Sequence, residues 1–261
     1  MRTNKTVTFI SGTAIGTLGG LIGLGGAEFR LPLLIGIFNF SALEAVILNK
    51  ATSLVVVASA MFFRTRTVPF DSVIDHQDVI LNLLLGSLVG AWLGASWAVR
   101  LKSQTLYRII AILLLVISCA LLLSHEVITD GIPPFTGLMR AMLGVIAGFA
   151  IGVVASLLGV AGGELLIPTL ILLFALDIKV AGSLSLAVSL PTMLTGFMRY
   201  SRDNSFSVLR ENKRFLLIMA AGSFAGTFLG GLLLGFVSDS LLLPMLAGIL
   251  VISAIKIWQH G

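Results

Sequence analysis

A lysine lies well inside one of the long apolar segments of this 261-residue chain, where a charged side chain is energetically unfavourable. Lys50 follows Asn49 and precedes Ser53 in ALEAVILNKATSLVVVASAMFF, several residues from either end of the segment. A charged group in hydrocarbon costs at least about 2.5–3.5 kcal/mol, so such residues usually face a cavity and serve a function. The sequence therefore predicts that Asn49, Lys50 and Ser53 bind an anion. An ion pair of Lys50 with Glu28 or Glu44 is the structural alternative.

Two glutamates and an arginine lie in the short apolar segments described next. Glu28 and Glu164 fall in the first turn of two predicted short helices, where the helix dipole favours a carboxylate, so helix capping is one interpretation. Proton coupling is the other, because burial disfavours the charged form of a carboxyl group. Arg30 either neutralises Glu28 or points to the anion, and Leu166 stands at the corresponding position of the second short helix.

A glycine cluster precedes each short helix. Residues 29–40 and 165–176 are apolar but too short to cross a bilayer, which takes roughly 20 residues. Glycine permits a sharp reversal, and the proline near each start fits a first helical turn. Each region therefore predicts a helix, a break and a half-helix; one long kinked helix is the alternative. The free N–H groups at a half-helix start bind anions, which here assigns Gly25, Gly26, Ala27, Gly162 and Gly163.

The two broken regions form an internal repeat that aligns without a gap. GTLGGLIGLGGAEFRLPLLIGIF starts at Gly16, and GVVASLLGVAGGELLIPTLILLF starts at Gly152, which sets a constant offset of 136. The same offset aligns GSLVGAWLG with GSFAGTFLG, whose glycines at every fourth residue are typical of helix packing in membranes. The repeat predicts two homologous halves, 1–130 and 131–261. It also matches Ser185 and Ser189 to Asn49 and Ser53, as further hydroxyl donors or as serines bonded to their own backbone.

The composition indicates a membrane protein. Apolar residues make up 57% of the chain and charged residues 11%, with a mean hydropathy of +1.07, whereas soluble domains carry about 25% charged residues. This excludes a cytosolic enzyme, a disordered protein and a nucleic-acid binder. Cys119 is the single cysteine, and no CxxC or HExxH pattern occurs, so neither a metal nor a cofactor is expected. The predicted spans are 7–26, 42–63, 79–98, 106–123, 138–159, 179–200, 214–237 and 240–258.

The basic residues between spans predict how the halves are oriented. If each glycine-broken hairpin returns to its starting side, eleven Lys and Arg residues fall on the side of the N-terminus and three on the other. If each broken segment crosses once, the division is about ten to four. Positive charge favours the cytoplasm, so the first arrangement, with inverted halves, is preferred over parallel halves.

The repeated motifs resemble those of a known transporter family. GLGGAEFRLPLL with downstream NKATSL, and GVAGGELLIPTL with downstream SLAVSL, are similar to the sulfite exporter TauE/SafE family over nearly the whole chain. The resemblance implies a multi-pass carrier that moves sulfite, small organosulfonates or related sulfur-containing anions outward. The chain departs from the commonest family signature by Glu28 and Glu164 after the glycines, and by Lys50.

These observations predict an all-α polytopic membrane protein of the plasma membrane. Each half would have a glycine-broken helix hairpin plus three membrane-spanning helices, the layout of carriers that work by alternating access. The chain is not expected to be an enzyme, because its spans contain no Ser/His or Asp/Asp pair. An anion channel, a carrier of small carboxylates and an assembly protein are the alternatives. The expected partners are a small anion and the lipid bilayer, with no nucleic acid; a homo-oligomer is compatible with the sequence.

Overall fold

The computed structural model is all-helical over the residues it describes, which are 4–22, 26–64, 73–124, 135–176, 178–233 and four positions between 251 and 258. The helices are α1 (Lys5–Ile22), α2 (Ala27–Gly36), α3 (Ala42–Arg64), α5 (Gln77–Arg100), α6 (Ser103–Ser124), α7 (Gly137–Leu158), α8 (Gly163–Phe174), α9 (Ile178–Tyr200), the 3-10 turn η1 (Asn204–Phe206), α10 (Ser207–Glu211) and α11 (Lys213–Leu233). This confirms the all-α class.

Four helices of the described part are long and apolar enough to cross a membrane. They cover Ala42–Met61, Gln77–Arg100, Gly137–Leu158 and Val180–Tyr200, and they match four of the predicted spans. Helices α1, α6 and α11 occupy three further predicted ranges. The eighth predicted span, 240–258, lies almost wholly outside the described residues, so the total number of spans stays a prediction.

The helix boundaries repeat at the offset seen in the sequence. Helices α2 and α8 begin at Ala27 and Gly163, and α5 and α11 begin at Gln77 and Lys213; adding 136 converts the first number of each pair into the second. Helices α3 and α9 match at both ends, because 42–64 becomes 178–200 when 136 is added. The repeat therefore extends from the sequence to the secondary structure.

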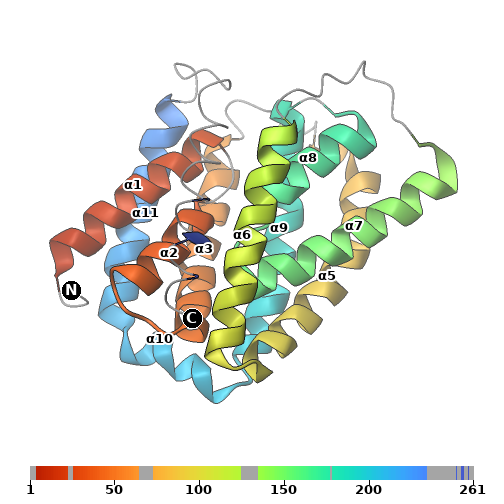
Figure 1. Ribbon diagram of the computed structural model, residues 1–261. Helices are drawn as coiled ribbons and strands as arrows, with labels where there is room; N and C mark the ends of the chain where they lie inside the picture. The colour runs from red at the N-terminus through yellow and green to blue at the C-terminus, as the bar shows by residue number, and fades with distance from the viewer. Residues whose placement is uncertain are drawn as a thin grey trace.

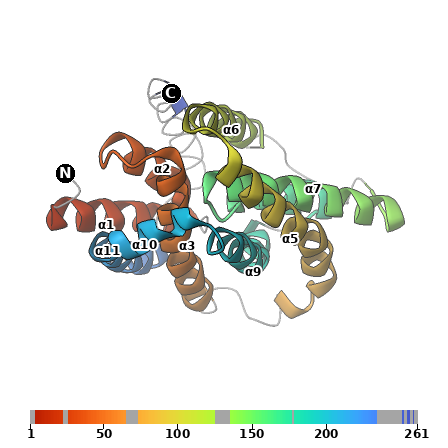
Figure 2. The ribbon, with the colours of Figure 1, turned by 90° about the horizontal axis from the view of Figure 1, so that it is seen from below.

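The two halves exchange helices, as Figures 1 and 2 show: α1 packs along α11, and α7 packs along α5, with α3 and α9 between these pairs. A side chain at Gly16 of α1 would collide with the backbone of Ser223, and one at Gly152 of α7 would collide with the backbone of Ser87. These two contacts are equivalent, since both positions shift by 136. Each half thus contributes one helix to each of the two pairs.

The glycines at every fourth residue allow this close approach. Small residues let membrane helices bring their backbones together, and a Cβ atom would run into a backbone oxygen of the partner helix at each of Gly86, Gly90, Gly94, Gly222 and Gly226. The helix-packing interpretation of these glycines is confirmed.

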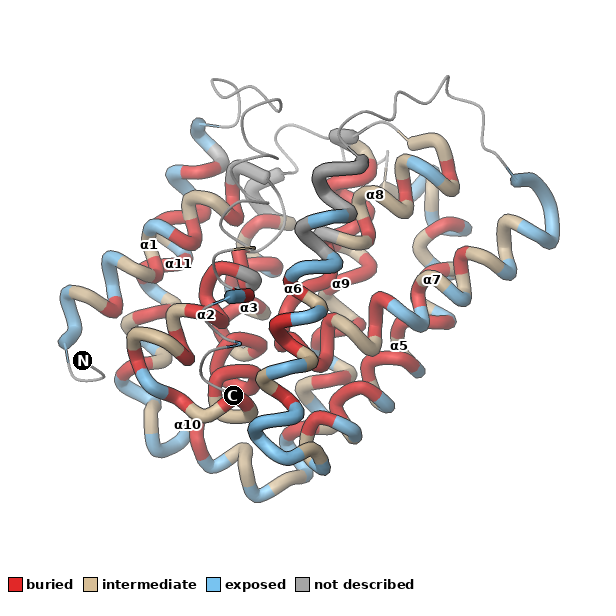
Figure 3. The backbone as a smooth tube through the Cα atoms, viewed as in Figure 1, coloured by how far each residue is buried: buried red, intermediate tan, exposed pale blue. Residues whose placement is uncertain are grey.

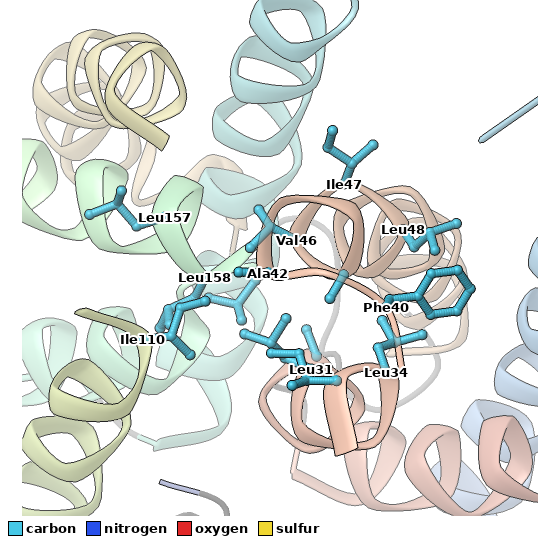
Figure 4. Close-up of a cluster of buried hydrophobic side chains, with 14 of the residues drawn as sticks. Leu31, Leu34, Phe40, Ala42, Val46, Ile47, Leu48, Ile110, Leu157 and Leu158 are labelled. Atoms are coloured by element: carbon cyan, nitrogen blue, oxygen red, sulfur yellow. The ribbon is translucent and has the colours of Figure 1, made fainter. Parts of the chain in front are cut away.

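A continuous hydrophobic core fixes the first broken hairpin against the second half. Leu31 of α2, Val46 of α3, Ile110 of α6 and Leu158 of α7 belong to one buried cluster (Figure 4). The flanking helices α5 and α7 instead have exposed residues along their length (Figure 3), and several of these are apolar, such as Leu85 and Ile146. The core therefore positions the end of α7 beside the starts of α2 and α3.

Candidate functional site

Both broken hairpins are interrupted by glycines with left-handed backbone. Gly26 precedes α2 with φ 64°, Gly159 ends α7 with φ 68°, and Gly162 precedes α8 with φ 84°. Glycine adopts this conformation without the steric penalty of a Cβ atom. The predicted breaks are confirmed, and a single long kinked helix is wrong. The N-cap residues of both half-helices are glycines, so neither N-cap provides a side-chain hydrogen bond. Gly25 lies outside the described residues.

The prolines lie deeper in the half-helices than predicted. Pro32 and Pro168 are each the sixth residue of their helix, so the expectation of a first-turn proline was wrong. Both helices start where the sequence predicted, directly after the left-handed glycines, and this start puts each proline in the second turn. A proline in the second turn cannot donate to the carbonyl four residues before it. In each half-helix this is the carbonyl of the glutamate, Glu28 or Glu164, whose side chains lie outside the described part of the structure.

Asn49 joins the two breaks. Its Nδ2 atom donates to the carbonyl oxygen of Ala27 at 2.9 Å and to that of Leu158 at 3.3 Å. Ala27 begins α2, and Leu158 ends α7. One fully buried amide therefore holds the start of the first half-helix and the end of the opposite long helix together.

Arg30 lies beside Asn49 and is also fully buried. Its Nη1 atom donates to Ser53 Oγ at 2.8 Å and to Asn49 Oδ1 at 3.2 Å. Its Nη2 atom donates to Ser223 Oγ of α11 at 3.4 Å. The arginine thus connects α2 and α3 to the second half, and it orients the amide that holds both breaks. Sequence reasoning missed Ser223, although this serine lies in the second of the two aligned glycine segments.

Lys50 reaches from α3 to the end of α7. Its fully buried Nζ atom donates to Ser156 Oγ at 3.2 Å and to the Ala155 carbonyl at 3.5 Å, and it lies 5.9 Å from the centre of the Tyr200 ring. The negative end of a helix dipole favours a cation at this place. Within the described part of the chain, Lys50 has no carboxylate partner.

The predicted alternative of a Lys50–Glu44 ion pair is wrong. The Glu44 carboxylate instead accepts the backbone N–H of Ser41 at 2.9 Å, at the start of α3. The two side chains are six residues apart on a helix, which places them on different faces. Glu44 therefore caps its own helix.

Three further residues complete the surroundings of Lys50, and sequence reasoning missed them all. A methyl group at Gly196 would lie 2.8 Å from Lys50 Nζ and 2.7 Å from Ser156 Oγ, so a larger residue there would displace these two side-chain ends. The Tyr200 hydroxyl donates to the Ser156 carbonyl at 2.8 Å. These residues come from α7 and α9, in the other half of the chain from Lys50.

The second half lacks the charged groups of the first. Leu166 is buried at the position equivalent to Arg30, and Leu186 at the position equivalent to Lys50. Ser185 donates to the carbonyl of Gly182 in its own helix at 2.8 Å, as the backbone alternative expected. Ser189 is buried, and its Oγ atom has no hydrogen-bond partner in the described part of the chain. The candidate site is therefore one-sided, with both cations contributed by the first half.

Comparisons with known proteins identify the family of the chain. A family model described as "Sulfite exporter TauE/SafE" matches residues 1–122 and 143–260. The chain is 25% identical over 241 residues to "Probable membrane transporter protein YunE" of Bacillus subtilis (strain 168), with 86% of each chain covered. No solved structure matches. Both matches extend over the two halves of the repeat.

Proposed function

Since the chain belongs to the sulfite exporter TauE/SafE family of membrane transporters, we propose that it carries small anions outward across the plasma membrane by alternating access. Sulfite and small organosulfonates are the proposed substrates. The supporting observation is Lys50, whose buried ammonium group lies at the junction of the two halves with neutral partners only in the described part of the chain. Membership in a transporter family also agrees with the prediction that the chain is not an enzyme.

The chemistry of the site suits an oxyanion. An ammonium group has three donor hydrogens, and the two oxygen contacts of Lys50, at 3.2 and 3.5 Å, are longer than charge-assisted hydrogen bonds of about 2.7–2.9 Å. An anion with several oxygens would offer closer acceptors to Nζ. The N–H groups in the first turn of α2 and the positive charge of Arg30 add to the attraction. We therefore assign Lys50 as an anion ligand and Arg30 as the residue that positions Asn49.

Flux through the purified protein tests this function. We expect proteoliposomes to take up labelled sulfite or a small sulfonate with saturation kinetics, because a carrier binds its substrate once per cycle. Sulfate and small carboxylates belong to the same panel. Linear, non-saturating flux would favour an anion channel. Preferential uptake of carboxylates would favour a carrier of small carboxylates. Absence of flux for every anion would contradict a transport function of the protein alone.

The packing of α3 against α9 supports inverted halves. Lys50, early in α3, lies beside Gly196, late in α9. Ala60, late in α3, clusters with Leu186, early in α9. The two equivalent helices therefore run antiparallel, and equivalent helices that cross a membrane in opposite directions belong to inverted repeats.

The basic residues predict which end of the molecule faces the cytoplasm. The start of α1, the α5–α6 connection and α10 lie toward the same end of the molecule, the lower end in Figure 1. The basic residues near this end are Lys5, Arg100, Lys102, Arg108, Arg199, Arg202, Arg210, Lys213 and Arg214. Because positive loops stay in the cytoplasm, we place this end inside the cell.

Cysteine labelling distinguishes inverted from parallel halves. Gln77 and Lys213 are equivalent, exposed positions at the starts of α5 and α11. In a background carrying Cys119→Ala, we expect an impermeant maleimide added outside intact cells to label Gln77→Cys and to leave Lys213→Cys unlabelled. Permeabilised cells, in which both should react, are the control. Labelling of both variants from the same side of intact cells would contradict the inverted arrangement.

A further inference from the structure

Two arginines at the end of α9 are held against α5. The Nε atom of Arg199 donates to Ser96 Oγ at 2.7 Å, and the guanidinium group of Arg202 lies 5.0 Å from the centre of the Trp92 ring. The two helices are also joined where Ser87 of α5 pairs with Thr192 of α9 at 2.7 Å, so they run in the same direction. In the described part of the chain, the Nη atoms of both arginines have no hydrogen-bond partner. Their charges are thus positioned but not neutralised by these contacts.

An apolar surface leads up to these arginines. Leu85, Val89, Leu93 and Trp97 form an exposed stripe along α5 at every fourth residue. Leu194 and Met198 are exposed on α9 in the turns before Arg199. A tryptophan followed by basic groups at a helix end is typical of the boundary between hydrocarbon and headgroups. The surface therefore offers acyl chains an apolar wall and offers a headgroup two guanidinium groups.

The fold itself does not require these polar residues. The positions equivalent to Trp92, Ser96 and Arg199 in the other half are Phe228, Leu232 and Phe63. These three positions are apolar there, whereas the position equivalent to Arg202 is Arg66, which is also basic. Trp92, Ser96 and Arg199 are therefore specific to the end of α5 and α9.

The local charge favours an anion. Arg100 ends α5 at the same end as Arg199 and Arg202, and Asp203 is the nearby carboxylate. Asp203 accepts the Ser205 backbone N–H at 2.9 Å and its hydroxyl at 2.6 Å. These bonds are the main reason that the pKa of the Asp203 carboxyl lies below its ordinary value, and Arg199 adds a smaller lowering. The carboxylate that interacts with Arg199 is thus already engaged by Ser205.

We propose that Arg199 and Arg202 bind the phosphate of an anionic phospholipid whose acyl chains lie along α5 and α9. Guanidinium groups match phosphate oxygens in geometry and charge. Basic pockets between membrane helices on the cytoplasmic side are known to hold anionic headgroups. This site is separate from the anion site at Lys50, and it does not depend on which substrate is carried.

Native mass spectrometry of the purified protein tests the proposal. We expect phosphatidylglycerol to stay bound and phosphatidylcholine to dissociate, since only the first carries a net negative charge. The double variant Arg199→Gln/Arg202→Gln should bind phosphatidylglycerol about tenfold more weakly, the effect of losing one charge-assisted contact. The matched control is Lys213→Gln/Arg214→Gln, which removes the same charge from the same end and should bind like the wild type.

Several results would overturn the lipid site. Equal retention of phosphatidylglycerol by the arginine variant, or equal loss in the control, would mean non-specific attraction. Displacement of the lipid by millimolar inorganic phosphate would indicate a site for free phosphate. A KM for sulfite that is higher for Arg199→Gln/Arg202→Gln than for the wild type in neutral phosphatidylcholine vesicles would indicate substrate capture instead. If the double variant does not fold, Ser96→Ala keeps both charges but releases Arg199, and it should still weaken lipid binding; unchanged binding would contradict the proposal.

Discussion

Replacing Lys50 with methionine is expected to raise the KM for the transported anion by about 10–150-fold, the effect of losing one hydrogen bond to a charged group. Methionine is unbranched and apolar, so it should fill the space between α3 and α7 without leaving a buried charge. The ammonium group is the only part of the interaction that is lost. Initial rates in proteoliposomes over a range of sulfite or sulfonate concentrations measure the change.

The repeat provides the control for this variant. Leu186→Met changes the equivalent, equally buried position of α9, and we expect its KM to match the wild type. Lys50→Arg keeps the charge but needs more room beside Gly196, so it should recover part of the affinity. A Lys50→Met protein with unchanged KM and a lowered unfolding temperature would assign Lys50 to the stability of the α7 end alone.

Replacing Arg30 with leucine is expected to lower the maximal rate of transport at least about tenfold and to destabilise the fold. The variant gives α2 the residue that α8 already carries at Leu166. Asn49 Oδ1 and the Ser53 and Ser223 hydroxyls then lose their donor, and each buried polar group left unsatisfied costs about 1–3 kcal/mol. Asn49 donates hydrogen bonds to both breaks. A less firmly held Asn49 should therefore slow the movement of one half against the other.

Separate measurements of rate, affinity and stability show whether Arg30 acts through Asn49. We expect the maximal rate to fall more than the KM rises, and Arg30→Lys, which keeps the charge but not the planar fork, to restore part of the rate. The matched control, Leu166→Met, alters the equivalent position of α8 and should leave both constants unchanged. A variant that loses affinity only, with normal rate and stability, would make Arg30 a direct ligand instead.

The breaks and the repeat were predictable from the sequence because each has a strict local cause. The left-handed backbone at Gly26 and Gly162 nearly requires glycine. An offset that stays constant along the chain leaves no freedom in how the halves align, and the helix boundaries follow it. The half-helices begin at Ala27 and Gly163, where their N-termini were predicted. By contrast, Pro32 and Pro168 were expected in the first turn, but each is the sixth residue of its helix.

The partners of the buried cations were not predictable in the same way. Lys50 contacts Ser156 and lies beside Gly196 because of the orientation of α3, α7 and α9 about their own axes. That orientation cannot be deduced from a single sequence. Ser185 and Ser189 illustrate the same limit. They lie four residues apart on one helix, yet one hydroxyl bonds to its own backbone and the other has no partner in the described part of the chain.

The exchange of helices between the halves also has a consequence for biogenesis. Helix α1 ends at Ile22 and α11 begins only at Lys213, yet the glycine face of α1 is covered by α11. Most of the chain is therefore synthesised before α11 is made. Until then, α1 lies in the bilayer or at the insertion machinery with its glycine face not covered by α11. The second pair differs, because α5 is already inserted when α7 emerges. The glycine face of α1 is therefore expected to become packed only after α11 has been inserted.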